Sequence, residues 1–387
     1  MTEREALVAF NMVESVPWGR IKSLADEAGG SYAKAWTRFA ARDAGRFGAI
    51  DPRTELERAE KMHVTVLTRL DQAYPAMLND LPEPPVCLYV SGNVQALSRV
   101  SIAMVGTRAA SPYGLDAADL FAHEFAARGV NVISGLALGI DGASHEGALK
   151  AGGGLTVGIL GGALDAFYPE ENRPLARRIV AEGGAVVSEY PFGRRPDRGT
   201  FPRRNRIVAA LSKGVLAVES PVKSGTLITC QIARSLGRPV MAIPGKFNSK
   251  FSAGCHGLVR SGAARLVVSV DEAMVDMGLL EGFDVEQAKA PAPRPVRMAA
   301  ASRPRSVEPK PMDPKPVKPE PKPPEGAPLS LEEAAVLKAI PESGTHIDRV
   351  CEALSISPMT FDGIAVSLRM KGFVKFLPGG RIGRVVR

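Results

Sequence analysis

Cysteine is scarce in this sequence of 387 residues, and no two cysteines form a C-x-x-C pair. Four scattered cysteines argue against a disulfide framework or a zinc site and are typical of a protein in a reducing compartment. Long hydrophobic runs are also missing, and the N-terminal residues include acids and no signal-peptide core. We therefore expect a cytoplasmic protein with no membrane contact and no bound metal. The cysteines are Cys87, Cys230, Cys255 and Cys351.

The motifs of several enzyme classes are absent as well. No G-x-x-x-x-G-K-[ST] phosphate loop is present, because the stretch around Gly245-Lys246 lacks the spacing and the hydroxyl. The glycines of segment 158–162 do not form G-x-G-x-x-G, so a dinucleotide site is not indicated. Asp141 and His145 share a helical face, and we interpret them as a capping aspartate and a hydrogen-bonded histidine rather than a catalytic pair. We expect no cofactor and no catalytic residue.

Acidic residues are outnumbered by basic ones. With 49 Lys and Arg against 41 Asp and Glu, the formal net charge is +8 and the pI is about 9.4. This balance favours a polyanionic partner, although charge alone does not identify it. Much of the excess lies before Ile207 and after Ala290. The hydrophobic content of 45% and the charged content of 23% are those of an ordinary soluble globular protein.

Changes in composition along the chain predict three folded domains and one linker. Residues 1–62 form a small N-terminal helical domain, and residues 63–283 alternate strands with helices. Residues 284–327 are rich in Pro, Lys and Glu, and such a segment cannot bury enough apolar surface to fold. Residues 328–387 resume the pattern of a compact domain.

In the central domain, short apolar strands separated by amphipathic helices predict an α/β fold with a doubly wound parallel sheet. The expected strands are Val86–Val90, Ser101–Val105, Asn131–Ser134, Leu155–Leu160, Ala185–Ser188, Val215–Glu219 and Val240–Ile243. The expected helices are Leu115–Arg128, Ala143–Lys150, Arg173–Ala181, Asn205–Leu211 and Leu227–Leu236.

The C-terminal domain has the pattern of a winged helix. We expect helices at Leu331–Ile340, Ile347–Leu354 and Ser357–Met370, followed by a hairpin of Phe373–Leu377 and Arg381–Val386. Three helices and a hairpin are typical of this variant of the helix-turn-helix.

Nearly every loop at the carboxyl end of a predicted strand is rich in Gly, Ser or Arg. Ligands bind at this edge of open parallel sheets, where loops lead into helix N-termini. Glycines let backbone amides approach an anion, and helix N-termini add partial positive charge. Together these loops indicate a groove that follows the phosphates of a nucleic acid. The candidate residues from the loops are Arg108, Ser111, Ser134, Gly135, Arg173, Ser224 and Gly225.

The segment Phe201–Arg206 packs a ring and three guanidinium groups into one turn, just before the apolar helical run Ile207–Leu211. We expect the helix that contains this run to begin at Asn205. Guanidinium groups bind phosphate oxygens bidentately, and a ring beside them can stack on an unpaired base. This combination favours single-stranded nucleic acid over a small metabolite. Alternatively, some of these arginines pair internally with Asp197 or Glu189. The candidates here are Arg198, Phe201, Arg203, Arg204, Asn205 and Arg206.

The ordered motifs between Leu67 and Val268 resemble the DNA-processing protein A family (DprA, also called Smf). The resemblance lies in Val105-Gly106-Thr107-Arg108, Ser134-Gly135-Leu136-Ala137, Leu160-Gly161-Gly162, Ser188-Glu189-Tyr190, Phe201-Pro202 with Arg204-Asn205-Arg206, Ser224-Gly225-Thr226, and Gly254-Cys255-His256.

This resemblance implies an extended Rossmann-like domain that forms homodimers and binds single-stranded DNA. It also implies protection of incoming DNA and loading of the RecA recombinase during natural transformation. The residues that match positions expected to line the DNA groove are Arg108, Arg198, Phe201, Arg204 and Asn205, with Arg173 as a further candidate.

Two regions depart from what the resemblance implies. The N-terminal helices look like the family's sterile-alpha-motif-like or helix-hairpin-helix region, but segment 16–20 lacks a Gly-x-Gly hairpin. The expected recognition helix carries Asp362 and has Arg369 as its cation, whereas major-groove readers normally carry more Arg, Lys, Asn or Gln. A protein contact or a structural role is at least as compatible with that helix as DNA reading.

Two other functions remain open from the sequence. A nucleotide phosphoribohydrolase of the lysine-decarboxylase-like Rossmann group would carry P-G-G-x-G-T-x-x-E, but Ser224-Gly225-Thr226 is followed by residues 227–229, which lack the acid. A transcription regulator would act through the winged helix on duplex DNA. The interpretation that we follow is a non-enzymatic single-strand binder.

Overall fold

The computed structural model describes residues 1–13, 16–153 and 155–281, and in the C-terminal part residues 329–341, 344–354, 356, 360–361, 364–365, 367–368, 371, 373–377 and 381–385. The chain divides into two compact units, Met1–Pro295 and Val296–Arg387. The linker predicted at 284–327 lies outside the described residues. The division into the four parts proposed from the sequence stays a prediction.

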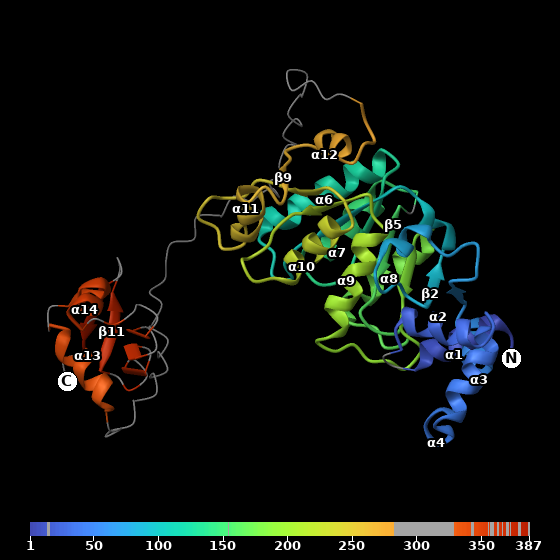
Figure 1. The fold of residues 1–387 in the computed structure, drawn as a ribbon. Coiled ribbons are helices and arrows are strands. Elements are labelled where there is room, and N and C mark those ends of the chain that lie inside the picture. Colours follow the sequence, from blue (N-terminus) through green and yellow to red (C-terminus); the bar gives the residue numbers. More distant parts are fainter. Residues whose placement is uncertain are drawn as a thin grey trace, which may run out of the picture. The chain divides into compact units, whose positions relative to one another are not determined.

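Short helices occupy the N-terminus, drawn blue in Figure 1. The first begins with a capping box, in which Thr2 and Glu5 bond to each other's backbone amides. Apolar side chains from the helices share one core with the first two strands of the sheet, and Phe10 meets Trp36 edge-on at 5.1 Å between ring centroids. The helices are α1 (Glu3–Met12), α2 (Trp18–Glu27), α3 (Tyr32–Ala41), α4 (Ala44–Phe47) and α5 (Pro52–Lys61).

A nine-stranded sheet forms the centre of the first unit, in the order β1-β2-β6-β5-β4-β3-β7-β8-β9. The seven strands β6-β5-β4-β3-β7-β8-β9 are parallel to one another, as the sequence predicts. Strands β1 and β2 pair antiparallel at one edge of the sheet, and β2 is antiparallel to its neighbour β6. The strands are β1 (Val64–Thr68), β2 (Cys87–Gly92), β3 (Ser101–Val105), β4 (Asn131–Ser134), β5 (Thr156–Ile159), β6 (Ala185–Ser188), β7 (Gly214–Ala217), β8 (Val240–Ala242) and β9 (Arg265–Leu266).

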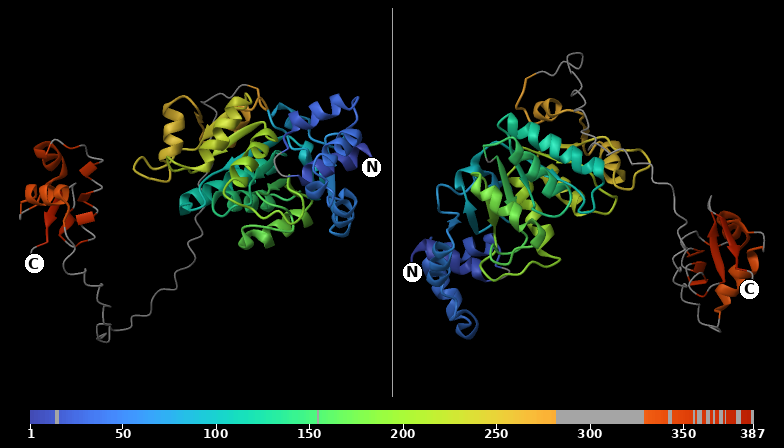
Figure 2. Two further views of the ribbon diagram at one scale, coloured as in Figure 1. Left: turned by 60° about the horizontal axis from the view of Figure 1, so that its bottom comes forward. Right: turned by 180° about the vertical axis from the view of Figure 1, so that it is seen from behind.

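Helices cover both faces of this sheet, so the fold is doubly wound (Figures 1 and 2). On one face, α9 and α10 pack on alternate residues of the strands, among them Ala103, Ile133 and Val215. On the other face, α6, α7, α8 and α12 pack on the intervening residues. The helices are α6 (Pro112–Ala127), α7 (Ile140–Lys150), α8 (Arg173–Ala181), α9 (Thr200–Ala210), α10 (Gly225–Ser235), α11 (Ala253–Arg260) and α12 (Val270–Asp276).

The C-terminal unit is a small winged-helix fold. Its three-stranded sheet has the order β10-β12-β11, and β11 and β12 form the predicted hairpin. Helical residues are described between 360 and 368, within the third predicted helix, but Asp362 and Arg369 lie outside the described residues. The elements are α13 (Leu331–Ala339), β10 (Thr345–His346), α14 (Ile347–Leu354), β11 (Val374–Leu377) and β12 (Arg381–Arg384).

No helix in the described part of the chain has both the length and the apolar character needed to cross a membrane.

Candidate nucleic-acid interface

Helix α9 begins at Thr200, five residues before the predicted start at Asn205. The carboxylate of Asp197 makes the earlier start possible, because its Oδ1 accepts the amides of Gly199 at 2.7 Å and Thr200 at 3.1 Å. Pro202 lies in the first turn, where its missing N–H costs no helical hydrogen bond. The prediction of a turn before the helix was therefore wrong: Phe201–Arg206 are helical.

The winding of α9 sends the side chains of this segment to two different sides. Positions three and four apart share a face of a helix. Accordingly Phe201, Arg204 and Asn205 line one pocket, while Arg203 and Arg206 face Glu189. The sequence prediction treated all five as one DNA-facing cluster, and the structure does not bring them together.

The pocket beside α9, here called the α9 pocket, lies at the carboxyl edge of the sheet and has a volume of about 300 Å³. Loops from β3, β4 and β7 meet there, as the sequence predicted for the ends of parallel strands. Its polar and aromatic lining includes Thr107, Arg108, Asp141, Phe201, Arg204, Asn205, Lys223, Ser224, Gly225 and Thr226.

Phe201 forms the aromatic wall of the α9 pocket and stands partly exposed. The guanidinium of Arg108 lies over its ring at 4.7 Å, and the ring of Tyr168 lies 6.0 Å away between centroids. Gly161 leaves space for the ring, since a Cβ there would lie 2.8 Å from a ring carbon of Phe201. A partly exposed ring flanked by an arginine is a surface on which a base can stack.

Arg204 forms the floor of the pocket and is only 5% exposed. Its Nη1 lies 3.8 Å from the carboxylate of Asp141, which also accepts the amide of Gly135 at 3.1 Å. Burial lowers the pKa of Arg204 and raises the pKa of Asp141, although each charge partly offsets the effect on the other. The Nε of Arg204 is buried and has no partner among the described residues. Arg204 therefore holds a positive charge beneath the pocket.

Gly135 is the position on which this packing depends. A Cβ at residue 135 would lie 1.2 Å from Nη1 of Arg204. The guanidinium therefore lies against bare backbone, and no larger residue fits there without moving it. The sequence analysis proposed Gly135 for its amide, but that amide already donates to Asp141.

The N-terminus of α10 forms the far side of the pocket. Ser224 is the N-cap residue, and its hydroxyl oxygen accepts the amide of Thr226 at 3.1 Å. Asn205 donates to the carbonyl oxygen of Gly225 at 3.3 Å and so ties α9 to α10. Lys223, which the sequence analysis missed, is exposed and also lines the pocket. Its position directly before the capping Ser224 was the signal that could have identified it.

Two predicted serines do not reach the α9 pocket. Ser111 caps α6, and both its amide and its hydroxyl donate to the carboxylate of Glu219, at 2.8 and 2.6 Å. Ser134 is fully buried and donates to the carbonyl oxygen of Met104 at 2.6 Å. Their side chains stabilise the loops rather than facing a ligand.

Two predicted arginines lie apart from the α9 pocket. Arg173 pairs with both carboxylate oxygens of Glu170 and lies 5.1 Å over the ring of Phe167, and it lines a different hollow. Arg198 is exposed in the loop before α9, and no ion pair joins it to any residue that the structure describes. Of the two, only Arg198 is available to a ligand that approaches α9.

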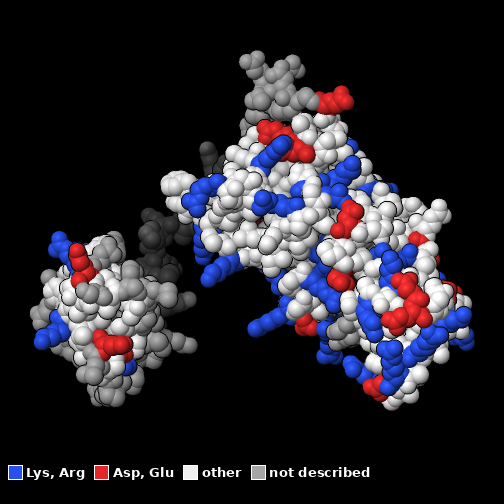
Figure 3. Space-filling view, in the orientation of Figure 1, with Lys and Arg blue, Asp and Glu red and all other residues white. Residues whose placement is uncertain are grey.

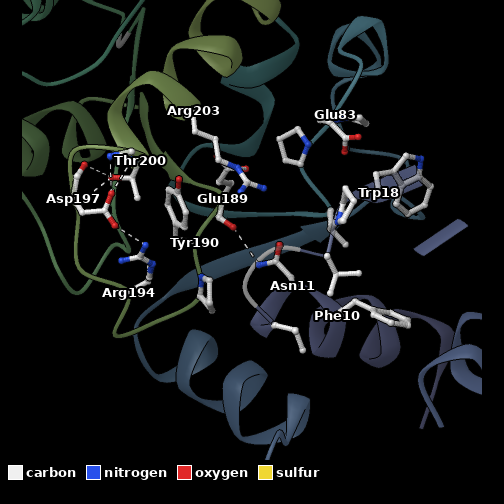
Figure 4. Close-up of a pocket in the computed structure, with 18 residues that line it drawn as sticks. Phe10, Asn11, Trp18, Glu83, Glu189, Tyr190, Arg194, Asp197, Thr200 and Arg203 are labelled. Carbon is white, nitrogen blue, oxygen red and sulfur yellow. Dashed lines mark hydrogen bonds and ion pairs between the residues drawn. The ribbon is translucent and has the colours of Figure 1, made fainter. Parts of the chain in front are cut away.

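The opposite side of α9 confirms the alternative of internal pairing for three arginines. Arg206 forms an ion pair with Glu189, and these two side chains are 12% and 6% exposed. Arg203 approaches the same carboxylate at 3.7 Å, and Arg194 binds Asp197 at 2.7 Å. Figure 4 shows Arg203 reaching toward Glu189 across a pocket that the N-terminal helices help to line. These charges are partly neutralised within the protein.

Asp141 and His145, which share a helical face in the sequence, bond to different partners. His145 is buried and its Nδ1 lies 2.7 Å from the hydroxyl of Thr156, away from Asp141, whose carboxylate bonds to the loop before α7. Among the residues that the structure describes, no group of three or more His, Cys, Asp or Glu could hold a metal ion.

Two family models and a curated relative identify the family of this chain. The model for DNA recombination-mediator protein A matches residues 65–278, and the model for the DprA winged helix domain matches residues 320–380. Protein Smf of Escherichia coli is 38% identical over 245 residues, which are 62% of this chain and 65% of that protein, so less than two thirds of its length is spanned.

Two solved structures are similar to this chain. The X-ray structure of DNA processing protein A from Streptococcus pneumoniae has a TM-score of 0.55 and 34% identity, covering 66% of this chain and 86% of that one. A structure reported for the single-stranded DNA binding mode of DNA processing protein A from Helicobacter pylori has a TM-score of 0.50 and 29% identity, covering 55% and 94%. Since the core model matches more than half of the sequence, the chain belongs to the DNA recombination-mediator protein A family.

Proposed function

We propose that this protein binds single-stranded DNA in the α9 pocket without cleaving it. The observation that carries the proposal is the partly exposed ring of Phe201, flanked by Arg108 at 4.7 Å, above the buried charge of Arg204. The Helicobacter pylori relative, whose structure concerns binding of single-stranded DNA, supports this use of the fold.

Each side chain of the pocket has a distinct part in this binding. Phe201 stacks on a base, which needs no particular sequence because every base has a π-face. Arg108, Arg198 and Lys223 neutralise backbone phosphates from the exposed rim. Gly225 begins α10, so its end of the helix offers partial positive charge to a phosphate oxygen.

Several finer parts of the proposal rest on family membership. The protein protects incoming single strands and loads the RecA recombinase onto them during natural transformation. It acts as a homodimer in the cytoplasm and uses no cofactor. The hydrolase alternative is not favoured by any specific observation, because the carboxylate that lines the α9 pocket, Asp141, bonds to Gly135 and faces Arg204.

Fluorescence anisotropy with a labelled thymidine oligomer tests the binding. Phe201→Ala should weaken affinity about ten- to a hundred-fold, since stacking is worth about 1–3 kcal/mol per base. Arg108→Ala should weaken affinity and reduce the log–log salt slope by about 0.7, the value for one phosphate on a single strand. Arg173→Ala, outside the pocket, is the matched control. Unchanged binding in both pocket variants would refute the proposal, and release of free base from a nucleoside monophosphate would support the hydrolase instead.

A further inference from the structure

A segment of the central domain that contains no acidic residue adjoins the α9 pocket. No Asp or Glu occurs between Glu219 and Asp271. The stretch contains α10, β8 and α11, and it includes Lys223 of the α9 pocket. Figure 3 shows Lys and Arg without Asp or Glu over α11 and the loop beside it. The cations of this stretch are Lys223, Arg234, Arg238, Lys246, Lys250, Arg260 and Arg265.

The loop that joins β8 to α11, residues 243–252, is here called the β8 loop. Its tip carries Phe247, which is 92% exposed, more than any other large hydrophobic side chain described. Lys246 and Lys250 flank it, and both are exposed. In the described part of the chain no carboxylate pairs with either lysine, and the Nζ of Lys250 lies 5.3 Å over the ring of Phe251.

The protein holds the base of the β8 loop firmly and leaves its tip free. Tyr113 donates to the carbonyl oxygen of Pro244, and a ring nitrogen of His256 lies 3.2 Å from the carbonyl oxygen of Gly245. At the other end, the amide of Gly254 donates to the carbonyl oxygen of Ser220 at 2.7 Å. The exposed side chain of Phe247 therefore stands at the tip of a loop whose base is held by hydrogen bonds.

The β8 loop continues the edge on which the α9 pocket lies. Strands β7 and β8 are parallel neighbours, about 4.8 Å apart, so their carboxyl ends lie side by side. Residues 220–221 contact Gly254, in the first turn of α11 directly after the β8 loop, and residues 223–226 line the α9 pocket. Val222, 65% exposed, lies between these two contacts along the chain. Segment 220–226 thus connects the base of the β8 loop with the α9 pocket.

We infer that the β8 loop is a second platform for the same DNA strand, on which Phe247 stacks a base while Lys246 and Lys250 bind the adjoining phosphates. This inference rests on the proposed function of the α9 pocket. A ring set between two lysines that pair with no described carboxylate complements a polyanion that exposes bases. Elsewhere in the stretch, Arg238 and Arg265 pair with Asp80 and Asp276.

The test compares two oligomer lengths on the full chain, about five and about fifteen thymidines, within the range of known single-strand sites. Phe247→Ala should weaken the long oligomer about tenfold and leave the short one unchanged, whereas Phe201→Ala should weaken both. Lys246→Ala with Lys250→Ala should reduce the salt slope for the long oligomer by about 1.4, or two phosphates.

The controls separate failure of this inference from failure of the proposed function. Val100→Ala removes an exposed apolar side chain at the amino end of β3, and Lys34→Ala removes an exposed cation on α3. If Phe247→Ala has no effect, or an equal effect on both lengths, while Phe201→Ala weakens binding, the second platform is overturned and the α9 pocket stands. If the unaltered chain binds neither oligomer, both proposals fall. Thermal unfolding of each variant checks that the fold is kept.

Discussion

At the scale of single residues, the α9 pocket depends on close packing between backbone and charge. The guanidinium of Arg204 occupies space that only a glycine at position 135 leaves open. Asp141 then fixes both partners, since it accepts the amide of Gly135 and faces Arg204. The position of one buried charge is thus set by a neighbour that has no side chain.

Gly135→Ala tests this dependence. The added methyl would lie 1.2 Å from Nη1 of Arg204, so the guanidinium must leave the pocket floor. We expect affinity for single-stranded DNA to fall, measured by anisotropy, with Arg204→Ala giving a loss of the same kind. Gly19→Ala is the control, because a Cβ there would meet nothing within 4 Å. Full affinity in Gly135→Ala would show that Arg204 does not act on the ligand.

A second residue-scale prediction concerns acid stability. Burial lowers the pKa of His145 to about 3, whereas the unfolded chain has an ordinary value of about 6.5. Below about pH 6.5 the unfolded state therefore takes up a proton that the folded state excludes. The free energy of unfolding should fall by about 1.4 kcal/mol per pH unit from this group between about pH 6 and 3.

Urea unfolding at several pH values compares the protein with His145→Gln. The variant cannot take up that proton, so its slope of unfolding free energy against pH should be smaller by about one proton equivalent. Equal slopes in the two proteins would mean that His145 is protonated alike in both states.

At the scale of elements, we expect replacement by alanine to have opposite effects on stability at two glycines of α11. A Cβ on Gly254 would lie 2.5 Å from the carbonyl oxygen of Pro221, so Gly254→Ala should destabilise the contact between α11 and residues 220–221. A Cβ on Gly257 would meet nothing within 4 Å, and Gly257→Ala should add about 0.5–1 kcal/mol of stability. Thermal unfolding measures both, and a loss at Gly257 or a gain at Gly254 would contradict the packing described.

Much of the element pattern was readable from the sequence, because alternating apolar strands and amphipathic helices are local signals. Strand β4, for example, has the predicted bounds Asn131–Ser134. The start of α9 was not readable in the same way, since it depends on Asp197 accepting amides in a loop dense with arginines. The wrong start of α9 mattered for the site. Because the segment is helical, Arg204 points into the α9 pocket while Arg203 points toward Glu189, and a turn would not have predicted this separation.

Long-range pairing explains what else the sequence could not show. The carboxylate of Glu189 neutralises Arg206, and only the fold brings β6 beside α9. Strand β2 likewise pairs antiparallel with β6, which is distant in the sequence, and no local sequence pattern specifies that the two strands are neighbours in the sheet. The edge of the sheet at which the α9 pocket lies was predictable, but the side chains that face this pocket were only partly so.

At the scale of the whole molecule, the chain consists of two units with separate cores. Residues such as Ile133 and Val215 lie in the first core, and Val336 and Phe361 lie in the second. We expect calorimetry of the full chain to show two transitions, and a chain ending at residue 281 to keep the midpoint of one of them. It should also keep the affinity of the full chain for single-stranded DNA. A single shared transition would show that the two units unfold cooperatively.

The acid-free stretch that carries the β8 loop also decides how the surface responds to its surroundings. Residues 220–270 contain no carboxyl group, so mild acidification changes none of the charge there by neutralising Asp or Glu. Dissolved ions, in contrast, compete directly for the phosphates that such a surface attracts. Binding of a strand at this end of the groove would therefore be regulated by ionic strength.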